Sequence, residues 1–243
     1  AKVRGFTPGD IVTAIGGAYA DYFVINPRLL VKIPETVNVL YALGEPVACC
    51  VHAGNRFGIK PGDRVAVVGC GFMGLICLQL ARYQGAGFIC AVDPLPDRRD
   101  MARRFGAAET SSPEAWQTDD IYQGEFEVVI EAAGSPGALD VCSEMVKQHG
   151  RLILVGYHQS NGGQRTVNMK LWNYKAIDVV NGHVRREDEK VEAMRQGLAL
   201  MQQGHLDTAP MVTTYGLSNI AAAFQTLANG QAGLFKAVIV PEE

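Results

Sequence analysis

Hydrophobic residues along this chain fall into short unbroken runs that alternate with longer stretches of helical periodicity. The short runs predict strands at Val65–Val68, at Phe88–Val92, near Ala108, at Phe126–Glu131, at Arg151–Val155 and at Ala176–Val180. Strands and helices that alternate in this way build parallel sheets with right-handed crossovers. The pattern therefore predicts an α/β fold with a doubly wound parallel sheet of six strands.

The segments between these strands carry helix start and stop signals. We expect a helix from Pro96 closed by Gly106, one capped by Ser112–Glu114, one from Pro136 to Gly150, and a helical turn at Asn168–Tyr174. After Arg186 the pattern changes, and spacing of Val191, Met194, Leu198 and Met201 predicts an amphipathic helix that Gly204 ends. We also expect a strand at Met211–Tyr215, a helix from Ser218 to Ala228, and a strand at Phe235–Val240.

The opening residues differ from the alternating part. They contain β-like pieces at Ile11–Ile15, Tyr22–Ile25 and Leu30–Ile33, with a Gly16–Gly17 turn, and helical spacing over 38–55 that breaks near Gly44–Glu45. We read them as the remnant of a small β-barrel that the C-terminal pieces rejoin. The predicted segments are thus 1–46, the nucleotide-binding 47–186, and the return at 187–243.

Composition excludes several classes of protein. The 243 residues are 48% hydrophobic and 19% charged, as in ordinary soluble globular proteins. A formal charge of −3 without a basic run gives no footprint for nucleic acid. No apolar run approaches the roughly 20 residues of a membrane span. The six cysteines are scattered without a C-x-x-C pair, which argues against a disulfide framework or a structural zinc site and favours the cytoplasm.

The strongest chemical signal follows the first strand of the sheet. Gly69–Gly74 fits G-x-G-x-x-G, between a buried strand and an apolar helix that runs to Tyr83. Gly69 permits a tight turn, Gly71 leaves room for a diphosphate to approach the backbone, and Gly74 lets the helix pack on the strand. The helix N-terminus then offers N–H groups and a positive dipole end to the phosphates.

An acidic residue at the end of the second strand strengthens this interpretation. Asp93 lies 19 residues after Gly74, where a carboxylate that binds ribose hydroxyls is expected. Its charge would repel a 2′-phosphate, so NAD is favoured over NADP, although Arg98 and Arg99 follow closely enough to receive a phosphate. The alternative is a glycine turn of another α/β fold, with Asp93 a solvated strand end.

The ordered motifs resemble a known family. EPVACCVHA, KPGDRVAVVGCGFMG, AVDPLPDRR, EAAGSPGAL and RLILVGY, after a β-rich opening, resemble the medium-chain dehydrogenase/reductase superfamily, in its zinc-dependent alcohol and polyol dehydrogenase branch. The resemblance implies a Rossmann sheet plus a partial GroES-like catalytic domain formed by both chain ends. It implies hydride transfer between a nicotinamide cofactor and an alcohol or ketone, assisted by zinc, and a homodimer or homotetramer paired through the last sheet strand.

The resemblance also assigns site residues. Glu45 falls at a zinc ligand or near-ligand, and His52 would lie in the same cleft wall, so both are candidate catalytic residues; otherwise Glu45 caps a helix and His52 is a packed helix histidine. The turn after the fourth strand would cover the adenosine ribose, and the next two strand ends would face the nicotinamide. The expected cofactor-binding residues are Gly69, Gly71, Phe72, Met73, Gly74, Asp93, Arg98, Ala133, Gly134, Val155, Gly156, Tyr157, Asn181 and Gly182.

One departure from the family pattern concerns the metal. The main zinc ligands of this family, a Cys and the His of a G-H-E motif, lie upstream of the segment that matches residues 1–10, and the loop that binds structural zinc is omitted. We expect a fragment of a longer dehydrogenase that by itself binds zinc poorly. The alternatives are a zinc-independent quinone or enoyl reductase of the same superfamily and a non-catalytic dinucleotide-binding module.

Overall fold

A six-stranded parallel sheet forms the centre of the computed structural model, which describes residues 3–16, 20, 22–116, 121 and 124–241. Its strands are β3 (Arg64–Val68), β4 (Phe88–Val92), β5 (Glu109–Ser111), β6 (Phe126–Glu131), β7 (Val146–Leu154) and β8 (Asp178–Asn181). They lie in the order β5-β4-β3-β6-β7-β8, and every neighbouring pair is parallel. The order reverses between β3 and β6, so the predicted doubly wound sheet is confirmed.

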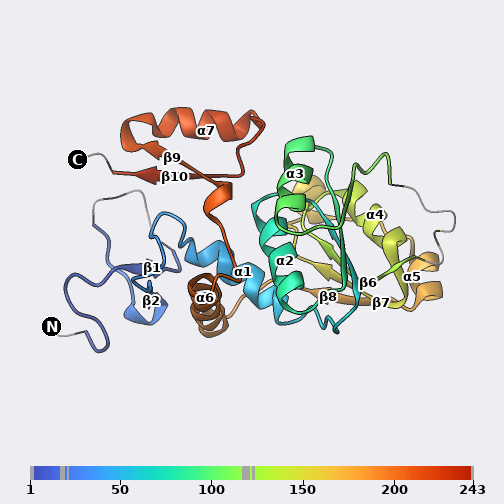
Figure 1. Ribbon diagram of the computed structural model, residues 1–243, viewed down its shortest axis with the longest axis horizontal. Helices are drawn as coiled ribbons and strands as arrows, with labels where there is room; N and C mark the ends of the chain where they lie inside the picture. The colour runs from blue at the N-terminus through green and yellow to red at the C-terminus, as the bar shows by residue number, and fades with distance from the viewer. Residues whose placement is uncertain (1–2, 17–19, 21, 117–120, 122–123, 242–243) are drawn as a thin grey trace.

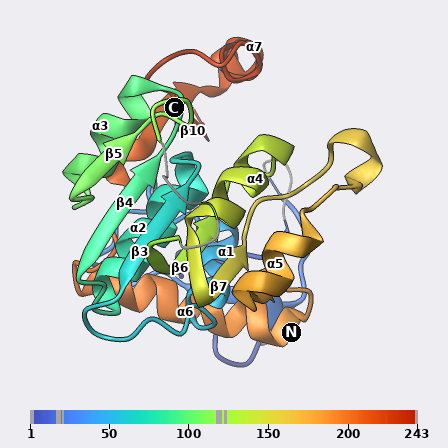
Figure 2. The same cartoon turned by 90° about the vertical axis from the view of Figure 1, so that its right-hand side faces the viewer.

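Helices cover both faces of the sheet. They are α2 (Phe72–Tyr83), α3 (Pro96–Arg104), α4 (Pro136–Met145) and α5 (Met169–Lys175). Alternate residues of β3 explain the two layers: Val65 and Val67 pack with α2 and α3, whereas Ala66 and Val68 pack with α4. Side chains that alternate between the faces of a buried strand give this division. Figure 1 shows α2 and α3 on one side of the strands, and Figure 2 looks from the side of α4 and α5.

The boundary between α4 and β7 differs from the prediction. The helix ends at Met145 rather than at Gly150, because Val146 is fully buried and pairs with Phe126 of β6. His149 takes a left-handed conformation at φ 56°, and the register of β6 and β7 shifts over this stretch. Tertiary pairing therefore overrides the helical pattern. Ser112 is also not followed by a helix: its hydroxyl accepts a bond from Ala115 N, but the described residues form a single turn.

The N-terminal part contains β1 (Val12–Ala14), β2 (Leu30–Lys32), a 3-10 turn at Pro27–Leu29 and helix α1 (Gly44–Gly54). The two strands pair antiparallel. The predicted strand at Tyr22–Ile25 is wrong: these residues have no regular secondary structure, and Tyr22 is 93% exposed. The predicted break at Gly44–Glu45 is the start of α1, preceded by turns, and Pro46 lies in the first turn, where its missing N–H is tolerated. The predicted Gly16–Gly17 turn extends outside the described residues.

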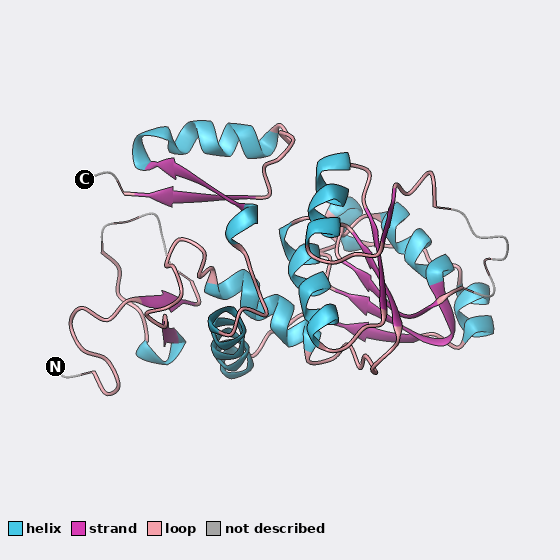
Figure 3. Ribbon diagram, in the orientation of Figure 1, coloured by secondary structure: helices cyan, strands magenta, loops and turns pink. Residues whose placement is uncertain are grey.

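The C-terminal part begins with the predicted amphipathic helix, α6 (Glu187–Gln202), which packs against α1. It continues with a 3-10 turn at Ala209–Met211, β9 (Val212–Gly216), a 3-10 turn at Leu217–Asn219, α7 (Ile220–Ala228) and β10 (Lys236–Val240). Helix α7 thus starts two residues after the predicted cap, Ser218. Strands β9 and β10 pair parallel in a sheet separate from β1 and β2, although both sheets lie at the same end of the molecule (Figure 3). The segment boundaries at residues 46 and 186 stay a prediction.

Candidate functional site

The glycine turn between β3 and α2 combines two tight positions with one open position. Gly69 has φ 95°, and a Cβ there would lie 2.7 Å from the backbone N of Ala133. A Cβ on Gly74 would overlap the carbonyl oxygen of Gly69. Gly71 has an ordinary φ of −72°, and the nearest atom to a Cβ there is the Arg98 guanidinium, 3.9 Å away. The fold therefore requires glycine at 69 and 74, whereas at 71 the missing Cβ leaves open space for a ligand.

Helix α2 presents its N-terminus to this open space. Gly71 is the N-cap, and the first helical hydrogen bond runs from Leu75 N to Gly71 O, so the N–H groups of Phe72, Met73 and Gly74 precede the helical ladder. No acidic side chain lies in this first turn. The Nζ of Lys236, from β10, lies 5.6 Å from the centre of the Phe72 ring and adds positive charge nearby. N–H groups and positive potential at a helix start fit a diphosphate.

Asp93 ends β4 beside the glycine turn, as predicted, and is almost fully buried, with 2% of its surface exposed. Its Oδ2 accepts a hydrogen bond from Cys70 N at 2.8 Å, and its Oδ1 accepts one from Leu95 N at 2.9 Å. An Arg98 nitrogen lies 3.8 Å from Oδ2, whereas Arg99 donates to the Asp93 and Pro94 carbonyls. The Asp93 carboxylate therefore stabilises the glycine turn through Cys70, and it also lies where a ribose is expected.

A buried carboxylate that sequence reasoning missed connects two of the expected cofactor-binding turns. Glu131, at the end of β6, is fully buried; its Oε1 accepts hydrogen bonds from Ala133 N and Gly134 N at 2.9 and 2.7 Å. Its Oε2 lies 3.0 Å from His158 Nε2, and Arg165 Nε donates to His158 Nδ1 at 2.8 Å. Because an arginine only donates, the proton of neutral His158 resides on Nε2 and points at Glu131. The available signal was an acid that ends a buried strand directly before a turn.

The turns after β6 and β7 also touch through their backbones. A Cβ on Gly134 would lie 3.0 Å from Tyr157 O, and one on Gly156 would overlap Gly134 N. Val155 N and Gly156 N both donate to Glu131 O, at 2.8 and 2.9 Å. The structure thus brings the predicted residues of these two turns together at one edge of the sheet.

A cavity of about 360 Å³ opens at the carboxyl ends of β7 and β8, and we call it the β7–β8 pocket. Its lining residues are Arg56, Leu154, Gly156, Tyr157, His158, Asn181, His183 and Arg185. His183 Nε2 lies 3.3 Å from Gly156 O, and Arg56 donates to Asn181 O. Gly182 N donates to Leu154 O at 2.8 Å, which aligns the two strand ends. The pocket contains three of the residues expected to face a nicotinamide.

Glu45 and His52 lie on α1 and point toward the start of α6 rather than into a metal centre. Glu45 Oε1 lies 3.3 Å from Lys190 Nζ and 3.4 Å from Cys49 Sγ. Burial, with the Glu45 charge second, raises the pKa of Cys49 to about 11 and favours the neutral thiol over a metal-binding thiolate. Burial also lowers the pKa of His52.

Zinc needs four ligands in a structural site and three protein ligands in a catalytic one. Among the residues that the structure describes, no group of three or more His, Cys, Asp and Glu side chains is arranged to hold a metal ion. The described residues therefore do not fit zinc by themselves, and Glu45 stands as a single candidate ligand that already shares its charge with Lys190.

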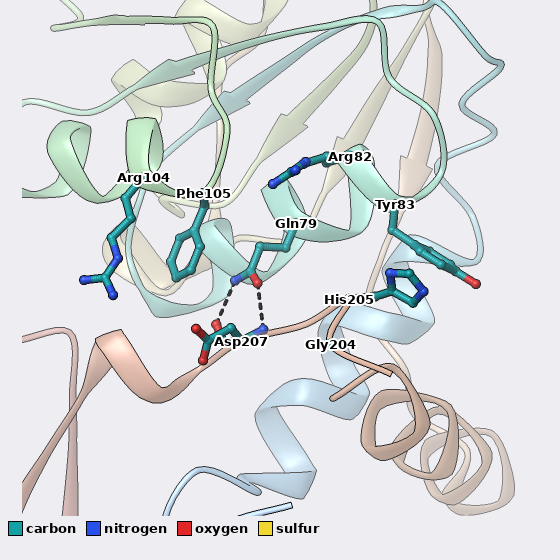
Figure 4. A pocket seen from close by; sticks show the side chains of 8 residues that line it. All are labelled: Gln79, Arg82, Tyr83, Arg104, Phe105, Gly204, His205 and Asp207. Carbon is teal, nitrogen blue, oxygen red and sulfur yellow. Dashed lines mark hydrogen bonds between the residues drawn. The ribbon is translucent and has the colours of Figure 1, made fainter. Parts of the chain in front are cut away.

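A second cavity, of about 550 Å³, lies at the C-terminal ends of α2 and α3, away from the carboxyl ends of the strands. Figure 4 shows its lining, in which the Gln79 side chain faces the backbone of Asp207. Gln79 Nε2 donates to Asp207 O at 3.0 Å, and Asp207 N donates to Gln79 Oε1 at 2.8 Å. This pair fastens the segment after α6 to α2, so the cavity belongs to a junction between parts of the fold.

No helix within the described residues is long and apolar enough to cross a membrane.

A protein-family model and several curated proteins match the chain. The family model described as zinc-binding dehydrogenase matches residues 73–203, more than half of the chain. A zinc-type alcohol dehydrogenase-like protein of Escherichia coli is 28% identical over 92% of the chain and 64% of its own length. The L-threonine 3-dehydrogenase of Bacillus velezensis is 28% identical over 93% of the chain and 65% of its own length. The chain thus spans just under two thirds of the length of these relatives.

Solved structures share the fold. L-idonate 5-dehydrogenase of Escherichia coli superposes with a TM-score of 0.80 at 22% identity, over 92% of the chain and 63% of that protein. A Sinorhizobium meliloti protein described as a zinc-binding dehydrogenase, solved bound to NADP, has a TM-score of 0.79 at 25% identity, over 93% of the chain and 66% of that protein.

Proposed function

Because the chain belongs to the zinc-binding dehydrogenase family, we propose that it binds NAD(H) and takes part in hydride transfer between the nicotinamide and an alcohol or polyol. The observation that carries the proposal is the open position at Gly71, in front of the N–H groups of α2 and beside Asp93. A Cβ on Gly71 would fill this open space without a close contact to the rest of the protein.

In this proposal the chain's own residues would bind the cofactor. The N–H groups of Phe72, Met73 and Gly74 would bind the diphosphate, and the remaining lone pairs of Asp93 would accept the ribose hydroxyls. The negative charge of Asp93 supports NAD over NADP, and Arg98 is the nearest cation that would soften this preference. Glu131 would hold the turns at Ala133–Gly134 and Val155–Tyr157 in place against the cofactor.

When bound, the nicotinamide supplies the hydride acceptor, and the substrate alcohol loses that hydride and a proton to become a ketone or aldehyde. The β7–β8 pocket supports substrate binding beside it, and L-threonine, sorbitol and L-idonate in the names of relatives are all alcohols. The described residues do not by themselves provide a zinc site that could assist this step. Strand β8 lies at the sheet edge, which supports the expected pairing of subunits there.

Isothermal titration of the chain with NADH tests the proposal. We expect one binding site and weaker binding of NADPH, and the proposed hydride transfer is tested by NADH formation from NAD and secondary alcohols with zinc added in excess. NADH binding without turnover of any alcohol would support the non-catalytic binding module instead. Absence of NADH binding would refute the oxidoreductase proposal.

A further inference from the structure

Two arginines, Arg56 and Arg185, give the β7–β8 pocket positive charge in a protein that carries a formal charge of −3. Two arginines and two histidines are among its eight lining residues, and none of those residues is acidic. Among the described ion pairs, neither Arg56 nor Arg185 has an acidic partner. By contrast the next residue, Arg186, binds Asp188 at 2.7 Å and lies 3.6 Å from Glu189. The guanidinium groups at the pocket are thus available to a ligand.

The pocket lies at the end of the cleft where a second reactant would meet the nicotinamide. Asp93 ends β4, and β3 and β6 separate it from β7 and β8 in the sheet order. At about 4.8 Å between neighbouring strands, three to four steps place the pocket roughly 14 to 19 Å from Asp93. A dinucleotide with its ribose at Asp93 and its diphosphate at α2 therefore points its nicotinamide toward the pocket. This placement rests on the proposed function.

The polar groups of the pocket are held in fixed positions. Arg56 is anchored by its bond to Asn181 O, and His183 Nε2 donates to Gly156 O at 3.3 Å because a carbonyl only accepts. The Arg185 guanidinium lies 5.9 Å from the centre of the Tyr157 ring, whose edge in turn faces the His183 ring at 5.6 Å between centroids. Packing against the Tyr157 ring limits the positions of the Arg185 side chain and reduces the entropy lost when it binds a ligand.

From these contacts we infer that the substrate is an alcohol with a negatively charged group, a carboxylate or a phosphate, which Arg185 and Arg56 bind. A guanidinium matches the oxygen atoms of either anion with two parallel charge-assisted hydrogen bonds. The hydroxyl-bearing carbon would then lie between this anchor and the nicotinamide. The pocket therefore selects charged polyols, such as sugar acids or sugar phosphates, over neutral ones.

Calorimetric titration of the chain with D-gluconate, D-sorbitol 6-phosphate and neutral D-sorbitol tests the inference, both with and without saturating NADH. We expect one of the anionic probes to bind about tenfold more tightly than sorbitol, the effect of one hydrogen bond to a charged group. Arg185→Gln should remove this advantage, and so should high salt. The matched control is Arg186→Gln, which changes the same charge outside the pocket and should keep the advantage. Which anion binds more tightly identifies the charged group.

The outcomes separate the two proposals. Equal affinities for sorbitol and both anions would overturn the inference even if NADH binds, and so would an advantage that survives in Arg185→Gln. An anion preference in a chain that fails to bind NADH would instead refute the dehydrogenase proposal and leave an anion-binding pocket.

Discussion

Replacing Gly71 by alanine changes the molecule only where the diphosphate of a cofactor is expected. Its φ of −72° and ψ of −175° suit any residue, and no atom lies within 3.9 Å of the new Cβ. The matched variant is Gly74→Ala, three residues along the same turn, where the new Cβ would overlap the Gly69 carbonyl oxygen. The first variant should impair binding with a stable fold, and the second should impair the fold itself.

The magnitudes follow from these positions. Alanine is a poorer N-cap than glycine, so Gly71→Ala should cost at most about 1 kcal/mol of unfolding free energy. Gly74→Ala forces backbone apart in a packed turn, which typically costs about 1–3 kcal/mol or more. If the Cβ at position 71 lowers NADH affinity tenfold, binding loses about 1.4 kcal/mol. NADH at 100 times the wild-type Kd stabilises the native state by about 2.7 kcal/mol, and roughly half of that would remain.

Urea unfolding with and without NADH, together with calorimetric titration, measures all three quantities. For Gly71→Ala we expect an unfolding curve near that of the wild type without NADH and a much smaller shift when NADH is added. Wild-type NADH affinity in this variant would refute the placement of the diphosphate on the turn. A large loss of stability without ligand would show that position 71 is structural rather than open.

Three further predictions concern buried or half-buried groups. Glu131→Gln presents an amide to the Nε2–H of His158 and should cost about 2–3 kcal/mol in urea unfolding and weaken NADH binding; unchanged affinity would show that the carboxylate does not position the cleft. Lys175 is fully buried and donates to two backbone carbonyls at the end of α4; Lys175→Met should therefore destabilise by about 2 kcal/mol, whereas exposed Lys170→Met, on the same helix, should change little. Because the folded-state pKa of Cys49 is raised to about 11, its protonated form is favoured by folding. That stability is complete below the ordinary thiol pKa and should be lost as pH rises from about 9 to 11. Iodoacetamide labelling of Cys49 should accelerate over the same range, and a midpoint near the ordinary value of about 8.5 would contradict the burial argument.

The parts of the fold that sequence predicted well are those where local pattern and tertiary packing agree. Phe88–Val92 and Phe126–Glu131 match β4 and β6 to the residue, because most positions of each segment are apolar and buried. The helix predicted to reach Gly150 failed where Val146 pairs with Phe126 across the sheet, since no local signal encodes a partner 20 positions away. Tyr22–Ile25 failed for a related reason, because β propensity without a partner strand forms no ladder.

The candidate site likewise contains features that local sequence predicts and features that only tertiary packing creates. Glycine spacing and the distance to Asp93 predicted the glycine turn and the strand end beside it, because these positions depend on local backbone geometry; their role in cofactor binding stays a prediction. The bond from Cys70 N to Asp93 and the chain of contacts from Glu131 through His158 to Arg165 could not be predicted, because they join separate strand ends. The charge of the β7–β8 pocket depends on Arg56 and Arg185, which only the packing of α1 beside β8 brings together.

The side-chain amide of Gln79 donates to the Asp207 carbonyl and accepts from the Asp207 N–H, as the backbone of a neighbouring strand would in a sheet. Both bonds must break together when the segment after α6 leaves α2, so that segment cannot fray one residue at a time. In hydrogen–deuterium exchange the Asp207 amide should then be protected along with the middle of α2, although turns and a 3-10 helix surround it. Helix α2, whose first turn is the expected diphosphate site, thus also sets the opening free energy of the C-terminal segment.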